Sequence, residues 1–191
     1  MMNLLVLGPQ GAGKGTQAKR ISSEYGIPHI STGDMFRAAI AAGTDLGKRV
    51  EPLLASGTLV PDDVTIALIR ERLSGDDATD GFVLDGFPRN LAQAEALDEM
   101  LGEIGRGLDA ILFFDVPDSV GMQRALSRAE LEGRSDDTPE AIQRRLDNYH
   151  RETEPLIEFY RTRGNVVPIH ANRSENEVFA EISRALEQVP A

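Results

Sequence analysis

The stretch LLVLGPQGAGKGTQAKR, residues 4–20, decides the fold. A short apolar run there ends in closely spaced glycines and a single lysine, and a polar helical pattern follows. Glycines let the backbone turn tightly and point its N–H groups inward, while the start of the next helix carries partial positive charge. The sequence therefore predicts a phosphate-binding loop between a strand and a helix. Its members are Gly11, Ala12, Gly13, Lys14, Gly15 and Thr16.

The loop departs from the generic pattern G-x-x-x-x-G-K-[ST] at the position after its lysine. Lys14 is expected to reach the terminal phosphates of a nucleotide. Gly15 follows it, and the hydroxyl group comes one residue later at Thr16. Because the generic hydroxyl ligates Mg²⁺ directly, we expect Mg²⁺ here to be held mainly by nucleotide phosphates and water, with no dedicated metal site of protein side chains.

Composition narrows the class of protein. With 191 residues and no linker rich in Pro, Gly or Ser, the chain predicts a single domain over residues 1–191. The net charge of −11 argues against nucleic acid as a partner and favours a small ligand in a local positive pocket. The chain has no cysteine, signal peptide or apolar run that could span a bilayer. We expect a cytoplasmic protein without zinc or a membrane partner, and a monomer, because no uncommitted apolar stripe stands out.

Short apolar runs closed by Gly, Asp or Pro predict buried parallel strands. They lie at residues 3–8, 81–86, 110–117 and 165–170, with a weaker candidate at 27–31. Helical patterns alternate with them at residues 14–25, 35–42, 46–56, 62–73, 91–104, 119–129, 139–163 and 175–189. The alternation predicts an α/β fold, a doubly wound five-stranded parallel sheet flanked by helices, with ligands at the carboxyl ends of the strands.

Two regions interrupt the alternation of strands and helices. Between residues 31 and 73 three short helical patterns follow one another without a strong strand, which predicts a flap beside the sheet, residues 31–60. The segment SRAELEGRSDDTPE, residues 127–140, is polar and contains Gly133. It predicts a mobile loop between two helices, with a short lid at residues 127–137.

The motifs GPQGAGKGT, STGDMFR and LDGFPRN, followed by a series of arginines, resemble adenylate kinase over essentially the whole chain. The resemblance implies a reversible, Mg²⁺-dependent transfer of the terminal phosphoryl group of ATP to AMP, giving two ADP, with a role in purine nucleotide homeostasis and AMP salvage. Many bacterial relatives carry a longer lid with a four-cysteine zinc site. Here only residues 127–137 occupy that place, so the resemblance is to the short-lid, zinc-free type.

The resemblance also implies an AMP site. Thr32 and Arg37 would contact the acceptor, Arg89 would clamp its phosphate, and Gln93 would hydrogen-bond its adenine edge. Taken alone, Ser31 or Thr32 could simply cap a helix, and a glutamine on a helix surface is uninformative. The remaining acceptor residues implied by the resemblance are Thr58, Leu59, Val60, Gly86, Phe87 and Pro88.

Asp85 is the acidic candidate at the site. It ends the predicted strand 81–86, where a carboxylate beside the phosphate loop could orient the water shell of Mg²⁺. Its alternative role is to cap the turn before Gly86.

Four arginines after residue 120 are candidate partners of the transferred phosphoryl group, which requires converging cations. Arg124 and Arg128 lie four residues apart, so one helical face presents both. Arg134 lies inside the predicted lid. The resemblance implies that Arg128 contacts ATP, that Arg134 and Arg145 contact both nucleotides, and that backbone near Arg173 borders the donor adenine.

The position of Arg145 can be argued from helical periodicity. Ile142, Leu146 and Tyr149 form an inward stripe, and Arg145 lies within roughly 60° of its centre, whereas Arg144 points away. An arginine on a buried helix face needs an anion. The anion could be a phosphate, or the neighbouring carboxylates of residues 136 and 137. The predicted catalytic set is Lys14, Asp85, Arg89, Arg124, Arg128, Arg134 and Arg145.

Two other functions remain open at this point. A UMP/CMP kinase would share the short lid, and Gln93 is the residue that argues against it. A P-loop switch protein would need a guanine-reading N-K-x-D motif or a glutamine after D-x-x-G, and the sequence has neither. The histidines, His29, His150 and His170, lack metal-ligand spacing and are expected to be structural. No covalent nucleophile stands out, which fits direct in-line transfer.

Overall fold

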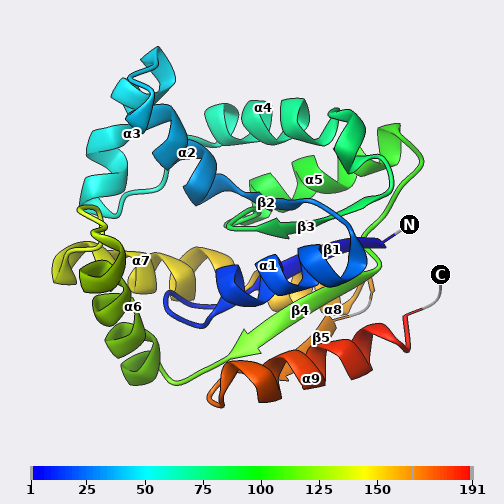
Figure 1. Cartoon of the computed structure of the whole chain (residues 1–191). Coiled ribbons are helices and arrows are strands. Elements are labelled where there is room, and N and C mark those ends of the chain that lie inside the picture. Colours follow the sequence, from blue (N-terminus) through cyan, green and yellow to red (C-terminus); the bar gives the residue numbers. More distant parts are fainter. Residues whose placement is uncertain (1, 165, 190–191) are drawn as a thin grey trace.

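A five-stranded parallel sheet forms the centre of the computed structural model, which describes residues 2–164 and 166–189 (Figure 1). The strands stand in the order β2-β3-β1-β4-β5, and every neighbouring pair is parallel. Their bounds are β1 Met2–Leu7, β2 His29–Ser31, β3 Gly81–Asp85, β4 Ala110–Asp115 and β5 Val166–His170. The predicted fold class and strand positions are confirmed. Asn165, in the predicted strand 165–170, lies outside the described residues.

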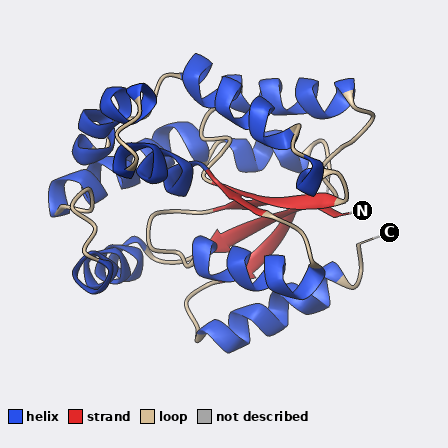
Figure 2. Cartoon of the chain, turned by 45° about the horizontal axis from the view of Figure 1, so that its top comes forward, coloured by secondary structure: helices blue, strands red, loops and turns tan. Residues whose placement is uncertain are grey.

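Helices cover both faces of the sheet (Figure 2), which explains why its strands are apolar throughout. Along β1, Leu4 and Val6 enter the core beneath α1 and α9. Leu5 and Leu7 enter the opposite core, beneath α4, α5 and α8. The bounds of these helices are α1 Lys14–Tyr25, α4 Asp62–Leu73, α5 Leu91–Glu103, α8 Leu156–Arg161 and α9 Glu175–Leu186, and a short 3₁₀ turn, η1 Asp76–Ala78, precedes β3.

The flap after β2 consists of two helices, α2 (Thr32–Ala41) and α3 (Asp45–Ser56). Its small core is separate from those of the sheet and includes Phe36, Val50 and Val60. The helix α2 starts three residues before the predicted bound, because the Ser31 hydroxyl accepts a hydrogen bond from the Asp34 N–H at 3.3 Å and caps it. As expected from the sequence, α2, α3 and α4 follow one another here without a strand between them.

The predicted loop at residues 127–140 is half helical, which corrects the sequence-based boundary. The helix α6 (Asp118–Glu132) continues past residue 129 and ends at Gly133, whose φ is 61°. Residues 130–132, ELE, are good helix formers, and Gly133 supplies the left-handed stop that follows a helix. The connection to α7 (Pro139–Asn148) is therefore only residues 133–138, and the Thr138 hydroxyl caps α7.

The predicted helix 139–163 is also broken. After α7 come a π-helical turn, η2 (Tyr149–Thr153), and then α8. Pro155 explains the break, because a proline inside a helix lacks the N–H donor and its ring clashes with the carbonyl four residues earlier. The last predicted helix is shorter than expected as well, since α9 ends at Leu186 rather than at residue 189.

Candidate active site

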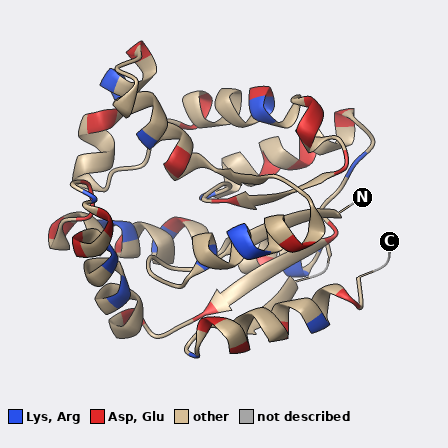
Figure 3. Ribbon diagram, viewed as in Figure 1, with Lys and Arg blue, Asp and Glu red and all other residues tan. Residues whose placement is uncertain are grey.

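A cavity of about 720 Å³ opens at the carboxyl ends of the strands, between the phosphate loop, the flap and α6. Basic residues of α6 and α7 gather on that side of the molecule (Figure 3), although the whole chain is acidic. Nearly all the predicted site residues line this one cavity. They are Gly11, Ala12, Gly13, Lys14, Gly15, Thr16, Thr32, Arg37, Thr58, Leu59, Val60, Asp85, Gly86, Arg89, Gln93, Arg124, Arg128, Arg134, Arg145 and Arg173.

Phe87 and Pro88, which were also predicted for the acceptor site, are not among the described residues that line the main cavity. The Phe87 side chain is fully buried in the core beneath α5. Pro88 lines a separate cavity of about 60 Å³ behind the phosphate loop. Both follow Gly86, which does line the main cavity, so the chain turns into the core directly after it.

The Lys14 ammonium lies at the base of the cavity, bonded to its own loop. Its Nζ donates hydrogen bonds to the carbonyl oxygens of Gly8 at 2.7 Å and Pro9 at 2.8 Å. Burial lowers the pKa of Lys14 to about 8; Asp85 partly offsets this effect, and the charges of Arg89 and Arg128 add to it. The lysine is therefore a cation held in place and available to an incoming phosphate.

The phosphate loop packs tightly against the start of α6. Gly11 has a φ of 75°, and a Cβ atom there would lie 1.9 Å from the carbonyl oxygen of Gly121. In turn, a Cβ atom on Gly121 would lie 2.5 Å from the carbonyl oxygen of Gln10. Only glycine fits at either position without a backbone shift. The helix that carries Arg124 and Arg128 thus rests directly on the loop that binds phosphate.

Asp85 ends β3 beside the phosphate loop, as predicted, and its Oδ2 lies 3.3 Å from Nε2 of His29 on β2. A Cβ atom on Gly15 would lie 3.5 Å from the same Oδ2. The open space beside Gly15, with the Asp85 carboxylate and the Thr16 hydroxyl, provides oxygen donors of the kind that Mg²⁺ prefers. Within residues 2–164 and 166–189, no group of three or more His, Cys, Asp or Glu side chains could hold a metal ion. These residues fit a Mg²⁺ ion that takes most of its ligands from phosphates and water.

Two carboxylates of the lid, Asp136 and Asp137, bind the guanidinium groups of Arg128 on α6 and Arg145 on α7. Asp137 accepts from Nη2 of Arg128 at 2.7 Å and also contacts Nη1 of Arg145. Asp136 accepts from Nη2 of Arg145 at 2.9 Å. Burial opposes ionisation of Asp137, whose side chain is fully covered, but Arg128 and Arg145 hold its pKa below the usual value. Here the carboxylates are the anions that the inward position of Arg145 requires.

The same carboxylates connect the lid to the flap. Nη1 of Arg37 on α2 lies 3.4 Å from Oδ2 of Asp136, while its Nη2 donates to Asp34 at 2.8 Å. Nη2 of Arg145 also donates to the Leu54 carbonyl on α3 at 2.9 Å. Arg134, within the predicted lid, bonds the exposed Glu132 at 2.6 Å. Flap and lid are therefore in contact through charged groups at the mouth of the cavity.

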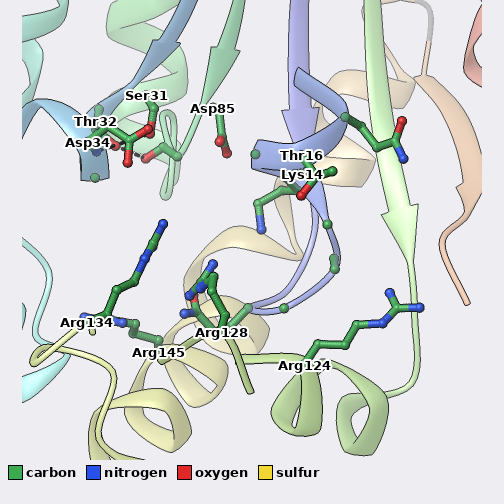
Figure 4. A pocket seen from close by; sticks show the side chains of 18 of the residues that line it. Lys14, Thr16, Ser31, Thr32, Asp34, Asp85, Arg124, Arg128, Arg134 and Arg145 are labelled. Carbon is green, nitrogen blue, oxygen red and sulfur yellow. Dashed lines mark hydrogen bonds between the residues drawn. The ribbon is translucent and has the colours of Figure 1, made fainter. Parts of the chain in front are cut away.

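Arg124 lies apart from the other arginines. Its Nη1 donates to the Ala171 carbonyl at 2.9 Å, and its Nη2 lies 3.5 Å from the Arg173 carbonyl. Figure 4 shows Lys14 and Arg128 pointing into one space while Arg124 is directed elsewhere. The spacing of four residues puts Arg124 and Arg128 on one face of α6. Arg124 nevertheless bonds the carbonyls that follow β5, whereas Arg128 bonds Asp137. The Arg173 side chain pairs with Glu181 at 3.6 Å, so its carbonyl is the part turned to Arg124.

The acceptor side is organised around the turn after β3. The Gly86 carbonyl accepts from the Thr32 hydroxyl at 2.9 Å and from Nε of Arg89 at 2.8 Å. Gln93 is buried, with its Oε1 accepting from the Arg89 N–H and its Nε2 donating to Asp62, both at 2.8 Å. These two bonds fix which end of the Gln93 amide is oxygen and which is nitrogen.

Sequence reasoning missed several residues that line the cavity. Gln17 and Lys19 follow Lys14 on α1. Gln17 lies three residues after Lys14, a spacing that puts both on one helix face and could have revealed it. Asp34 stands in the motif STGDMFR but was not singled out. Leu131, at the exposed end of α6, lines the mouth and carried no sequence signal.

The fold and the cavity define a P-loop nucleotide phosphotransferase, with a glycine-rich loop after the first strand, a lysine at its base and arginines from two later helices. The comparisons narrow this class. The adenylate kinase family model matches residues 6–165. Adenylate kinase of Cyanothece sp. is 50% identical over 99% of this chain and 97% of its own length. Adenylate kinase of Xanthomonas euvesicatoria is 48% identical over 97% of this chain and 99% of its own length. Adenylate kinase of Shouchella clausii is 42% identical over 98% of this chain and 99% of its own length. The chain belongs to the adenylate kinase family.

Membership makes the chain a nucleoside monophosphate kinase. No helix in the described parts of the chain is long and apolar enough to cross a membrane.

Proposed function

We propose that this cavity carries out the Mg²⁺-dependent, reversible transfer of the terminal phosphoryl group of ATP to AMP, giving two ADP. The observation that carries the proposal is that a phosphate loop with its lysine and the arginines of the lid and flap line one cavity. The direct test is whether the purified chain converts two ADP to ATP and AMP. A protein that only hydrolyses ATP would contradict it.

On the donor side, the N–H groups of the phosphate loop and the start of α1 bind the phosphates of ATP. The Lys14 ammonium gives up its hydrogen bonds to the carbonyls of Gly8 and Pro9 and donates to phosphate oxygens instead. Asp85 and Thr16 face the side where Mg²⁺ accompanies the nucleotide, and bound Mg²⁺ supplies charge neutralisation on the phosphates. The donor adenine lies against the segment that contains Arg173, and Arg124 acts at this base end rather than on the transferred group.

On the acceptor side, Thr32 and Arg37 come from the flap, and Arg89 comes from the turn after β3. Arg89 is held by the Gly86 carbonyl, which positions its guanidinium for the AMP phosphate. Gln93, oriented by Asp62 and the Arg89 N–H, faces the adenine edge. The backbone of Thr58, Leu59 and Val60 lines the same base.

Transfer requires Arg128 and Arg145 to exchange one set of anions for another. In the absence of nucleotide, Arg128 and Arg145 bind Asp136 and Asp137, and the phosphoryl group takes over these guanidinium groups together with Arg134. Positively charged groups that converge on the equatorial oxygens stabilise the charge of the transition state. The two carboxylates thus keep the arginines assembled and neutralised until a phosphate arrives.

We further propose that the chain acts in the cytoplasm as a monomer and without zinc. The absence of cysteine supports the zinc-free lid. Light scattering of the purified protein tests the oligomeric state.

Acceptor specificity is the first prediction. AMP should be used at least about 10²-fold more efficiently than CMP, UMP or GMP, because a pocket of oriented hydrogen-bonding groups rejects a wrong edge strongly. The measurement is kcat/KM for each nucleoside monophosphate at saturating ATP. Similar values for AMP and CMP would favour the UMP/CMP kinase alternative.

The pKa of Lys14 predicts a pH effect. Because that pKa is lowered to about 8, the free enzyme loses this cation as pH rises through that value. We expect kcat/KM for ATP to fall about tenfold per pH unit above it. The plot of kcat should stay level to higher pH, because bound phosphates raise the pKa again.

The control for this pH effect is Lys14→Arg, whose side chain stays charged and whose kcat/KM should show no such decline, whatever its absolute rate. A flat kcat/KM profile for the unmodified enzyme up to pH 10 would contradict the assignment.

A further inference from the structure

Gln17 is a buried polar side chain in the wall of the cavity, less than one helical turn after Lys14. It is only 2% exposed, and its Nε2 donates to the Glu175 carbonyl at 2.9 Å. A carbonyl can only accept, so the amide nitrogen must face it. This leaves Oε1 pointing the other way, buried, and without a hydrogen-bond partner among the described residues. An unpaired buried acceptor destabilises a fold, so a glutamine kept here despite that cost points to a function for the bond that its Nε2 makes.

The partner of Gln17, Glu175, is the first residue of α9 and ends the segment 171–175 that follows β5. The cavity wall includes Ala171, Arg173, Ser174 and Glu175 from this segment. Two other elements hold it. Arg124 on α6 donates to the carbonyls at its start, and Gln17 on α1 donates to the carbonyl at its end. The wall is therefore fixed at both ends by side chains of the lid helix and of the phosphate-loop helix.

We infer that Gln17 is a positioning residue for the donor base. It ties the segment 171–175 to α1, and α1 begins at Lys14, so it sets the distance between the place of the adenine and the place of the phosphates. This inference rests on the proposed assignment of the donor adenine to that segment. Oε1 is buried, so Gln17 acts through the segment and not by touching the nucleotide.

The test is Gln17→Met, which keeps the length of the side chain and removes both the donor and the unpaired acceptor. We expect KM for ATP to rise about five- to tenfold, the effect of one hydrogen bond. KM for AMP should stay within about twofold, because the acceptor site lies on other elements. The melting temperature should be unchanged or higher, because replacing polar groups by an apolar group of the same shape can be stabilising.

The matched control is Arg20→Met. Nη1 of Arg20 donates to the same Glu175 carbonyl at 3.1 Å, yet Arg20 is not among the described residues that line the cavity. The Arg20 bond is exposed, so water can replace it, whereas the Gln17 bond is buried. This variant should therefore change KM for ATP less than about twofold. If Gln17 were only a structural anchor of α9, both variants would lower the melting temperature and neither would separate KM for ATP from KM for AMP. That result would overturn the inference.

A third variant, Arg124→Ala, separates this inference from the donor-site assignment on which it rests. A rise in KM for ATP in Arg124→Ala without one in Gln17→Met would overturn the role of Gln17 and leave the donor site in place. No change in either variant would show that the donor base binds elsewhere, and both statements would then fail. A rise in both, with KM for AMP constant, is the expected result.

Discussion

Replacing Arg145 with alanine is expected to lower kcat by about 10³-fold or more, the usual cost of removing one cation from a phosphoryl-transfer transition state. The same change at Arg144 should leave kcat nearly unaffected. The Arg145 side chain is 13% exposed and lines the cavity, whereas Arg144 is exposed on the opposite face of α7. Steady-state kinetics at saturating ATP and AMP measure both variants.

The comparison is internally controlled, because one residue type is changed at two adjacent positions of one helix. Arg145→Ala should stay folded, since Asp137 keeps Arg128 at 2.7 Å and is not left as an unpaired buried charge. Thermal denaturation checks this point. Equal kinetic effects at Arg144 and Arg145 would mean that Arg145 serves the salt bridges with Asp136 and Asp137 and not the phosphoryl group.

Chelation of Mg²⁺ is expected to abolish transfer, and added Mg²⁺ should restore it. The cavity has cations for the transferred group, but Gly15 replaces the hydroxyl that would ligate the metal, so the ion must arrive with the nucleotide. Its removal leaves phosphate charge that Lys14 and the arginines do not neutralise. The assay is ADP disproportionation with EDTA, followed by Mg²⁺ at increasing concentration.

A chelator selective for zinc provides the control, and it should change neither turnover nor melting temperature. Metal analysis of the purified protein completes the experiment. Stoichiometric zinc in the purified protein would contradict the prediction that the lid binds no zinc.

The phosphate loop could be predicted because its requirements lie in contiguous residues, where backbone turns, a lysine and a helix start follow one another. The strands could be predicted because burial on both faces leaves an uninterrupted apolar run. Arg145 was placed correctly because Ile142 and Leu146 define the inward face of α7. In each case a local pattern determines the outcome.

Other features depend on partners far along the chain, and these were missed. Helical spacing predicts the face of α6 from which Arg124 leaves, but not where its long side chain ends. The guanidinium group bonds carbonyls that lie 47 and 49 residues further along the chain. Phe87 was assigned to the acceptor site with its neighbours, yet its ring fills the core beneath α5. Pro155 is different, because its effect on a helix is local and was visible in the sequence.

Gly11 and Gly121 touch near one end of α6, so this contact is a possible pivot for a tilt of the helix. Gly121 is the fourth residue of the helix, and Glu132 at the far end lies about 16 Å beyond it at 1.5 Å per residue. A tilt of about 10° at the pivot would therefore carry the Glu132 end through about 3 Å. The far end of α6 leads directly into the segment that holds Arg134, so the same tilt would move that segment. A methyl group at Gly121 would meet the Gln10 carbonyl oxygen at 2.5 Å and push this end of α6 away from the loop, and the length of the helix would enlarge that small displacement at Glu132.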